Sequence, residues 1–273
     1  MAKLDTGTED LLADLAEGVL TITLNRPAAR NAMSDAMNQA LGRQLAAAEV
    51  DPAVKVVVLT GAGQGFCAGG DVKGMDARNS GGGRAATLDE AIATQRLNQR
   101  ATAGKLFKMP KPTIAALPGA AAGAGLSLAL ACDLRVMAKT AIMTTAFARV
   151  GFSGDYGGTY FLTQLVGAAK ARELYFLSDR VSADEALRLG LANWVVEPDE
   201  LAAKTREVAQ RLASGPTVAL RYMKENLNRA MAGEWDDCMD LEATHHVHCG
   251  QTHDHKEAAK AFVEKRQPVF EGR

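Results

Sequence analysis

Paired cysteines and an excess of charge of either sign are both missing from the sequence, and each absence excludes a class of protein. The 273 residues include four cysteines, none at Cys-x-x-Cys spacing, which fits reduced thiols in a cytosol better than a disulfide framework. Lys and Arg number 31 against 32 Asp and Glu, a net charge of −1, so no global field attracts nucleic acid or an anionic membrane. Any phosphate site must therefore be local.

Targeting and membrane-spanning segments are missing as well. Residues 1–10 carry Asp and Glu and have no apolar core of the signal-peptide type, and no apolar run reaches the length that crosses a bilayer. We therefore expect a cytoplasmic protein with no nucleic-acid or membrane partner. With 47% apolar residues, the chain is expected to form one large globular domain, or a domain with a small appendage.

A glycine-rich segment follows a predicted buried strand. Residues 54–60 are rich in β-branched side chains, which is typical of a strand, and residues 61–71 then hold five glycines. Glycines allow positive φ and a close backbone approach, which leaves amide N–H groups free for an anion. The alternative is a mobile surface turn, but Phe66, Cys67 and Ala68 are too apolar for one. Neither the phosphate-loop motif nor the dinucleotide-binding motif is completed.

A second segment of small residues leads into an apolar helix. Residues 118–133 run from Pro-Gly-Ala-Ala-Ala-Gly into Leu-Ser-Leu-Ala-Leu, so a helix N-terminus with unpaired N–H groups is available to face negative charge. Two loops can thus supply two amide donors. Such an oxyanion hole suits a substrate whose carbonyl becomes an enolate or a tetrahedral intermediate.

These two segments carry a resemblance to a known family. Phe66–Asp71 and Gly119–Asp133 resemble the two signature blocks of the enoyl-CoA hydratase/isomerase (crotonase) superfamily. The likeness continues from Leu24–Pro27 to Phe262–Arg266, so it covers nearly the whole chain.

The resemblance implies both an architecture and a substrate class. The fold would be α/β, with a crotonase-like spiral of ββα repeats over residues 1–200. Residues 201–273 would form a C-terminal helical region that builds trimers and closes the CoA site. An acyl-CoA thioester would be the substrate and a homotrimer or a dimer of trimers the assembly. No metal and no separate cofactor are implied, because coenzyme A is part of the substrate.

Local patterns predict secondary structure along the chain. Period-2 alternation predicts strands and apolar residues three or four apart predict helices, while Ser34, Thr87 and Ser182 are predicted helix caps. Three consecutive glycines within residues 72–84 indicate a mobile loop that acts as a lid. Strands are predicted at residues 20–24, 54–60, 113–117, 134–138, 141–144 and 192–196, and helices at 34–48, 87–109, 123–131, 159–166, 168–177, 182–189, 201–214, 216–231 and 235–266.

The resemblance also assigns the groups that act on the thioester. The oxyanion donors would be the backbone N–H groups of Gly70 and Ala124. Hydratases of the family use two glutamates, and at the matching positions this chain has Ser127 and Phe147. Addition of water by two glutamates is therefore not expected. Ser127 is expected to line its helix or hold a water, and Phe147 to form a pocket wall.

Asp155 is the remaining candidate for acid–base chemistry. Residues 150–158 resemble the segment where some isomerases of the family, including dienoyl-CoA isomerases and the ring-epoxide isomerases of phenylacetate breakdown, place a catalytic aspartate. One base suffices to move a double bond, because it can remove an α or γ proton and return it to another carbon. The alternative is that Asp155 only caps the helix that begins at Gly157 and Gly158.

Coenzyme A needs contacts of its own. By resemblance, four residues surround its adenine and pantetheine and two from the last helix approach its nucleotide: Ala29, Ala68, Asp71 and Val72, then Phe262 and Lys265. Arg26 and Arg30 are alternative contacts, and Lys265 is otherwise a solvated helix charge.

All five histidines lie within residues 245–255. His245, Cys249 and His253 would share one face of a continuous helix, so a zinc site is one alternative. A solvent-facing or subunit-contacting helix face is the expected role. Cys67 as a nucleophile is a further alternative, but no histidine lies near it in sequence, and packing is expected.

Two classes of function remain open from the sequence. The first is an enzyme of acyl-CoA and fatty acid metabolism, with double-bond isomerisation favoured and hydration or thioester hydrolysis as alternatives. The second is a noncatalytic acyl-CoA binder that kept the fold after losing both glutamates. Exchange of acyl α or γ protons with deuterated water distinguishes them, because only an enzyme catalyses it.

Overall fold

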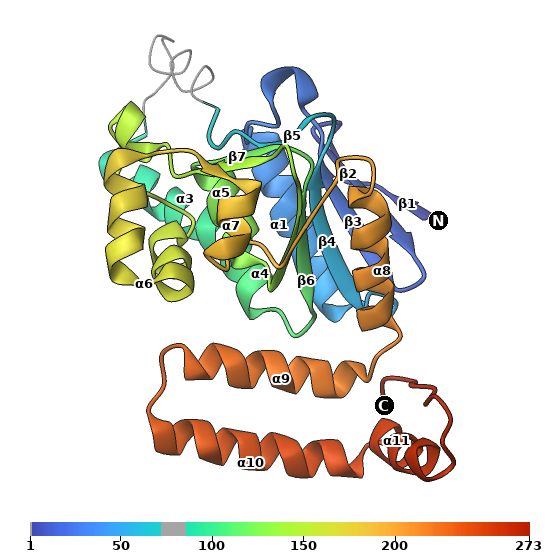
Figure 1. Ribbon diagram of the computed structural model, residues 1–273. Coiled ribbons are helices and arrows are strands. Elements are labelled where there is room, and N and C mark those ends of the chain that lie inside the picture. The colour runs from blue at the N-terminus through green and yellow to red at the C-terminus, as the bar shows by residue number, and fades with distance from the viewer. Residues whose placement is uncertain (1, 72–85) are drawn as a thin grey trace.

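The computed structural model describes residues 2–71 and 86–273, and its centre consists of two sheets (Figure 1). The strands are β1 (Ala2–Leu4), β2 (Leu11–Ala16), β3 (Val19–Leu24), β4 (Val56–Gly61), β5 (Gly65–Cys67), β6 (Thr113–Leu117), β7 (Ala120–Ala122), β8 (Leu134–Ala138), β9 (Ile142–Thr144), β10 (Val181–Ser182) and β11 (Trp194–Val196). The larger sheet has the order β1-β2-β3-β4-β6-β8-β11, and the smaller has the order β10-β9-β7-β5.

Helices surround these sheets and continue beyond them. They are α1 (Asp35–Val50), α3 (Leu88–Ala101), α4 (Ala103–Lys108), α5 (Ala124–Ala131), α6 (Gly158–Leu177), α7 (Ala183–Arg188), α8 (Leu201–Ala213), α9 (Thr217–Ala230), α10 (Trp235–Gln251) and α11 (His253–Val263), with 3-10 turns η1 (Pro27–Ala29) and η2 (Phe147–Val150). No helix within the described ranges is both long and apolar enough to cross a membrane.

The centre of the larger sheet is parallel and buried on both faces. β3 pairs with β4, β4 with β6, β6 with β8 and β8 with β11, all in parallel. All five residues of β6 are buried, which explains its continuous apolar sequence. The parallel β3–β4 pair has α1 as its connection, so the predicted strand–helix–strand unit is confirmed.

The local signals for α1 act as predicted. Ser34 precedes the helix, and its side chain accepts a hydrogen bond from the Met37 N–H. Met37, Leu41, Leu45 and Ala48, which recur every three or four residues and so predict this helix, are buried. α1 therefore begins at its cap and packs by the face that its periodicity indicates.

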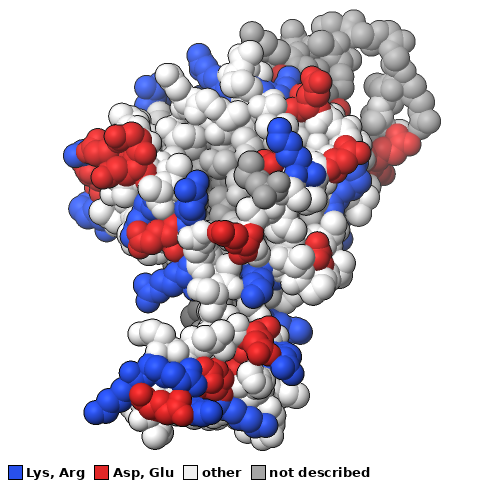
Figure 2. All heavy atoms as spheres, turned by 90° about the vertical axis from the view of Figure 1, so that its right-hand side faces the viewer, with Lys and Arg blue, Asp and Glu red and all other residues white. Residues whose placement is uncertain are grey.

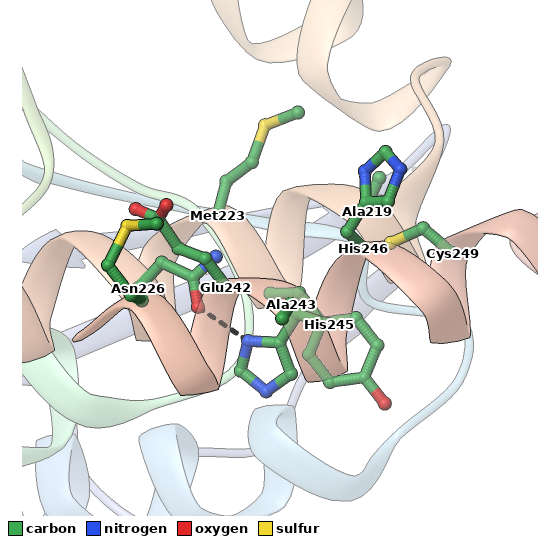
Figure 3. Close-up of a pocket in the computed structure, with 10 residues that line it drawn as sticks. Ala219, Met223, Asn226, Glu242, Ala243, His245, His246 and Cys249 are labelled. Carbon is green, nitrogen blue, oxygen red and sulfur yellow. Dashed lines mark hydrogen bonds between the residues drawn. The ribbon is translucent and has the colours of Figure 1, made fainter. Parts of the chain in front are cut away.

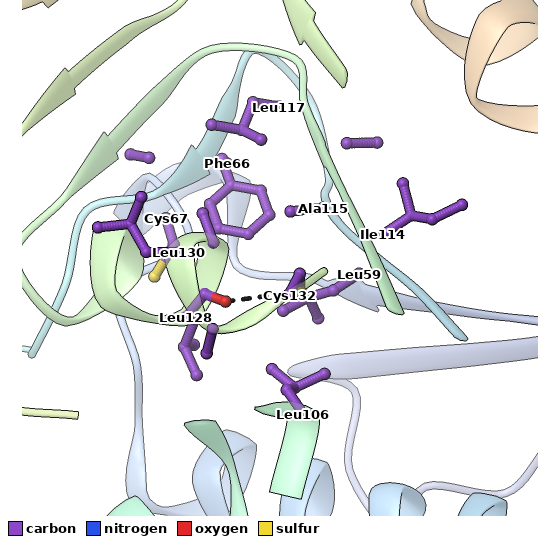
Figure 4. Packing of buried hydrophobic residues seen from close by; sticks show 14 of the residues in the cluster. Leu59, Phe66, Cys67, Leu106, Ile114, Ala115, Leu117, Leu128, Leu130 and Cys132 are labelled. Atoms are coloured by element: carbon purple, nitrogen blue, oxygen red, sulfur yellow. Dashed lines mark hydrogen bonds between the residues drawn. The ribbon is translucent and has the colours of Figure 1, made fainter. Parts of the chain in front are cut away.

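The glycine-rich segment runs through the core rather than over the surface. Phe66 is fully buried, and Cys67 is buried beside it (Figure 4). The other members of this cluster include Leu59, Leu106, Ile114, Leu117 and Leu128. The alternative of a mobile surface turn is therefore wrong for the part of the segment that contains β5. Residues 72–84, where a mobile lid was predicted, lie outside the described residues.

Breaks in three helical regions bear on the predicted helix ranges: two divide a helix that was predicted as continuous, and one confirms a predicted division. The helix predicted over residues 87–109 is two helices, because Thr102 leaves helical geometry (φ −114°, ψ −88°). The one predicted over residues 235–266 also divides, because the Thr252 side chain caps a new helix, α11. In α6 the predicted separation into two segments is confirmed by Gly167 (φ 75°, ψ 164°).

Some elements carried no usable sequence signal. β5, β7 and β10 have two or three residues each, and β5 and β7 lie within the glycine- and alanine-rich segments. β1 and β2 were not predicted either, although they pair antiparallel at one edge of the larger sheet. No residue of α3 is buried, and Leu97 is 65% exposed, so the apolar residues of α3 lie outside the core.

The C-terminal helices divide into two groups. α8 packs against β3, β4, β6 and β8, so it covers the sheet although it follows the boundary predicted between residues 200 and 201. α9, α10 and α11 lie below the sheets as a separate layer (Figure 1). On the face shown in Figure 2, acidic and basic side chains are interspersed over both the upper body and this layer. That face therefore has no field of one sign.

Candidate active site

The two segments predicted to carry the oxyanion donors lie side by side. The Met33 N–H donates to the Gly69 carbonyl (2.8 Å), and Met33 forms a β-bridge with Gly70. Gly69 has φ 93°, and a Cβ added there would lie 2.9 Å from the Ala122 carbonyl oxygen and 3.4 Å from the Ala124 nitrogen. The Gly69–Gly70 backbone therefore adjoins the first amide of α5.

The first turn of α5 provides the second amide. Ala124 is the first residue of α5, so its N–H has no acceptor within the helix. Gly123 precedes it with φ 52° and makes no side-chain cap. The structure thus brings Gly70 and Ala124 into one region, while their role as donors stays a prediction.

Cys67 fixes the distance between these two segments. A Cβ added at Gly125 would overlap the Cys67 carbonyl oxygen and lie 2.6 Å from the Cys67 Cβ, so α5 touches β5 through backbone. The Cys67 thiol donates to the Asn31 carbonyl (3.1 Å). Burial raises the pKa of the Cys67 thiol to about 12. The thiol stays protonated at neutral pH, which favours packing over the nucleophile alternative.

Asp155 lies in the turn before α6. Its side chain is half-buried, and Asp155 Oδ1 is closed to solvent without a hydrogen-bond partner in the described part of the chain. Burial raises the pKa of Asp155 from its ordinary value of 3.8 to about 6. A carboxyl group with a pKa in this range can accept a proton and release it near neutral pH.

The capping alternative for Asp155 has no support in the geometry. The N-cap of α6 is Gly157, and no side chain caps this helix. Asp155 contributes only its backbone carbonyl, which accepts from the Gly158 N–H (3.0 Å). The turn is held from outside by Gln99 of α3, whose Oε1 accepts from the Tyr156 N–H (2.6 Å). Tyr156 takes a left-handed conformation there (φ 48°).

The two positions that hold glutamate in hydratases carry no acid. Ser127 is buried, and its Oγ donates to the Gly123 carbonyl (3.3 Å) within its own helix. Phe147 is buried and stacks on Tyr175, with ring centroids 5.8 Å apart and planes 8° apart. These contacts fit the expected roles of a helix-lining hydroxyl and a pocket wall.

The residues predicted to contact CoA fall into two places. Ala29 in η1 is half-buried, and Ala68 is exposed and linked to the same loop through its N–H, which donates to the Arg30 carbonyl (3.0 Å). Arg26 Nη1 pairs with Asp71 Oδ2 at 2.9 Å. Val72 lies outside the described residues.

The other two predicted contacts lie far from Ala29, Ala68 and Asp71. Phe262 is exposed in α11, and Lys265 is exposed two residues beyond the end of this helix, so the prediction that Lys265 belongs to the last helix is wrong. α11 lies at the opposite end of the molecule from β5 and β7 (Figure 1). One chain therefore does not bring all the predicted CoA contacts together.

The histidine segment borders a groove of about 500 Å³ between α9 and α10 (Figure 3). His245 is buried there, with Nδ1 2.6 Å from Asn226 Oδ1 and its ring stacked on Tyr222 at 4.1 Å. His253 belongs to α11 instead, because the helix breaks at Thr252. The continuous face behind the zinc alternative is therefore wrong, and no three potential ligands cluster among the residues with a described position.

Sequence reasoning missed three residues around Asp155. Gln99 supports the turn from α3, Tyr156 lies within it, and Tyr175 approaches it from the far end of α6. No local sequence pattern identifies them. Gln99 and Tyr175 are single polar residues far in sequence from Asp155, and Tyr156 is next to a carboxylate that is the more obvious candidate.

Known proteins are similar to this chain over nearly its whole length. A family model described as enoyl-CoA hydratase/isomerase matches residues 14–273. The 1,2-epoxyphenylacetyl-CoA isomerase of Escherichia coli (strain K12) is 36% identical over 265 residues, which cover 97% of this chain and 99% of that protein. The short-chain-enoyl-CoA hydratase of Clostridium acetobutylicum is 36% identical over 250 residues, covering 91% and 92%.

A solved structure shows the same arrangement. The crystal structure of an enoyl-CoA hydratase from Polaromonas sp. JS666 superposes with a TM-score of 0.88 at 32% identity, and the match covers 96% of this chain and 99% of that one. The predicted crotonase-like α/β fold class is therefore confirmed.

Proposed function

Because the chain belongs to the enoyl-CoA hydratase/isomerase family, we propose that it moves a double bond in an acyl-CoA thioester without net addition of water. The observation that carries this proposal is the half-buried Asp155, with a pKa raised to about 6, in a site whose two hydratase-glutamate positions are Ser127 and Phe147. A single base accounts for isomerisation, whereas the family's hydration reaction uses two acids.

The proposed reaction begins at the thioester carbonyl. Its oxygen accepts hydrogen bonds from the Gly70 and Ala124 N–H groups, each of which typically contributes about 2.7–4 kcal/mol to such a transition state. Asp155 removes an α or γ proton, and the electron pair of the broken C–H bond becomes part of a dienolate. The same carboxylic acid then returns the proton to the other end of the dienolate. The product is an isomer of the substrate, and Asp155 is ionised again.

The names of the relatives include both reactions of the family, isomerisation and hydration. The Escherichia coli relative is named an isomerase and the Clostridium acetobutylicum relative a hydratase. Isomerisation is favoured here by Asp155, and ring-epoxide isomerisation of a phenylacetyl thioester belongs in the substrate panel because of the first name.

Mass spectrometry of products formed in deuterated water tests the proposal. The panel contains 2-enoyl-CoA and 3-enoyl-CoA esters of several lengths and 1,2-epoxyphenylacetyl-CoA. Isomerisation keeps the mass apart from exchanged deuterium, hydration adds one water, and hydrolysis releases free CoA. Exchange into the acyl group with no other change still indicates an enzyme. No exchange and no product with any ester would instead identify a noncatalytic binder.

Asp155→Asn tests the residue. The amide keeps the shape without the base, so turnover is expected to fall about 10²–10⁴-fold with little change in affinity for the ester. Asp199→Asn, at an exposed position outside the site, is the matched control and should be unchanged. Ser127→Ala should have a much smaller effect. Near-normal turnover of the Asp155 variant, or a hydroxyacyl-CoA formed at hydratase-like rates, would contradict the assignment.

We further propose that the chain forms a homotrimer or a dimer of trimers through its C-terminal layer. Support comes from large apolar side chains that are exposed on α9 and α10: Met223, Leu227, Trp235, Met239 and Val247. Covering such surface is a usual reason for association. Light scattering at micromolar concentration checks the state, and a monomer would contradict it.

The separation of the CoA contacts leads to a related proposal. Since α11 lies at the opposite end of its own chain from β5, Phe262 and Lys265 would contact the nucleotide of an ester bound to another copy. Lys265→Ala should then raise KM without lowering kcat, and Lys260→Ala, five residues earlier in α11, is the control. We also propose a cytoplasmic location and no cofactor beyond the CoA of the substrate.

A further inference from the structure

A phenol hydroxyl lies inside the turn that carries Asp155. A Cβ added at Gly158 would lie 2.6 Å from Tyr175 Oη, and one added at Gly154 would lie 3.4 Å from the same atom. The hydroxyl is therefore close to the backbone on both sides of Asp155. The two glycines leave the room that the phenol ring occupies.

The reversal of α6 at Gly167 brings Tyr175 to this turn. Gly158 and Tyr175 are 17 positions apart in sequence, and a straight helix would separate them by about 25 Å. The non-helical Gly167 (φ 75°) lets the second half of α6 fold back beside the first, as Figure 1 shows. Stacking on Phe147 then fixes the Tyr175 ring. The contact with the turn is thus built by the tertiary fold.

Three neutral groups lie around Asp155. These groups are the Cys67 thiol from β5, Tyr156 in the same turn and Tyr175 from α6, all of which have raised pKa values and are neutral near pH 7. The Tyr156 hydroxyl lies beside the Asn38 side chain of α1, whereas the Tyr175 hydroxyl lies against the backbone on both sides of Asp155. Among the described residues, Asp155 Oδ1 has no hydrogen-bond partner.

The two side chains form no hydrogen bond in the described structure. We propose that Tyr175 is a positioning residue for Asp155: when the ionised carboxylate turns toward it, the Tyr175 hydroxyl donates a hydrogen bond and holds the carboxylate directed at the acyl group. The inference rests on the proposed function, in which Asp155 is the base. A donor to the carboxylate favours its ionised form and so moderates the effect of burial. The hydrogen bond also restricts rotation of the Asp155 side chain, so that the carboxylate oxygen that removes the proton stays pointed at the acyl group.

Tyr175→Phe tests this inference, because phenylalanine keeps the ring and its stacking on Phe147 and removes only the hydroxyl. Loss of a hydrogen bond to a charged group corresponds to about a 10- to 100-fold fall in kcat. The acidic limb of the kcat/KM profile should also move upward by about one pH unit, because the ionised carboxylate loses a donor. A role in packing alone would not move that limb.

Tyr160→Phe is the matched control. Tyr160 lies on the same helix and packs against Phe107 and Phe161, so its variant should keep both kcat and the pH limb of the unmodified protein. Circular dichroism and thermal unfolding of both variants exclude a folding defect as the cause.

A double variant separates this inference from the proposed function. In the Asp155→Asn background, Tyr175→Phe should have almost no further effect, because the carboxylate that it positions is absent. If Asp155→Asn is inactive while Tyr175→Phe keeps its rate and pH limb, the inference on Tyr175 is wrong and the function stands. Independent, multiplicative losses would also overturn the inference. Full activity of Asp155→Asn overturns the function itself.

Discussion

The two ends of the molecule are assembled by different kinds of contact. Around the oxyanion segments, backbone touches backbone, and Gly125 adjoins Cys67 with no room for a side chain. The C-terminal layer is joined to the core through long polar side chains instead. Lys224 of α9 reaches Asp133 and two backbone carbonyls, and Asn228 reaches the Phe107 carbonyl. The first kind of contact fixes positions closely, and the second fastens one layer to another.

The largest expected effect comes from adding one methyl group to the first region. In Gly125→Ala the new Cβ would overlap the Cys67 carbonyl oxygen, and neither backbone can give way without moving β5 or α5. We expect a loss of about 4 kcal/mol or more in unfolding free energy, or no soluble protein, together with loss of activity. Urea unfolding and the turnover assay measure both.

Gly250→Ala is the same substitution in the second region. A Cβ there has no neighbour within 4 Å, and the position lies inside α10. Alanine should therefore raise stability by about 0.5–1 kcal/mol through its better helix propensity. If Gly125→Ala is equally harmless, the claim that α5 and β5 pack backbone against backbone at Gly125 is contradicted.

The second effect concerns the connection between the two regions. Lys224 is 7% exposed, and its Nζ lies 2.8 Å from Asp133 Oδ2. Lys224→Met keeps the stem but removes the charge paired with Asp133 and the Lys224 donor to two backbone carbonyls, a loss that typically lowers stability by about 3 kcal/mol. Hydrogen exchange should show α9 to α11 opening while β4 and β6 stay protected.

Lys260→Met provides the comparison within the layer itself. Its pair with Glu264 is exposed and spans 3.9 Å, so removing it should change stability by less than about 1 kcal/mol. Equal exchange rates in the Lys224 and Lys260 variants would show that Lys224 does not fasten the layer.

The third effect returns to the site and, like that of Gly250→Ala, is stabilising. The pKa of Asp155 is about 6 in the folded protein against an ordinary 3.8, so the folded state binds the proton more tightly than the unfolded chain. The buried Asp155 carboxylate therefore lowers the free energy of unfolding. This loss of stability is absent below pH 3.8, grows as the pH rises, and is complete above pH 6. The shift corresponds to at most about 3 kcal/mol, and partial exposure reduces this to about 1–2 kcal/mol.

Asp155→Asn should therefore stabilise the fold at pH 8 and leave it unchanged near pH 3.5, while it removes activity. Urea unfolding at the two pH values checks the sign, with Asp199→Asn as the control. Equal stability of the variant and the unmodified protein at both pH values would show that burial does not raise this pKa.

Elements with a regular apolar period were predictable, and short or polar ones were not. α1 has a cap and a buried stripe in one continuous segment, so local physics was sufficient to predict it. β5 and β7 have three residues each, and they exist because a neighbouring strand pairs with them. The break at Thr102 was missed for a similar reason, since the apolar pattern continues through it while the backbone does not.

The sequence by itself determined the strand–helix–strand pattern and the two amide-bearing segments. These follow from residue types and short spacings, which act within a few residues of the chain. Its resemblance to the family indicated that Ser127 and Phe147 stand where hydratases have two acids and that Asp155 is the remaining acid. Only the tertiary structure decided that Gly69 lies against Ala124, that Asp155 is buried enough to raise its pKa, and that Tyr175 faces it. Each of those contacts joins segments far apart in sequence, and burial depends on everything that packs around a group. A local sequence pattern contains neither these long-range contacts nor the degree of burial, because both are set only in the folded chain.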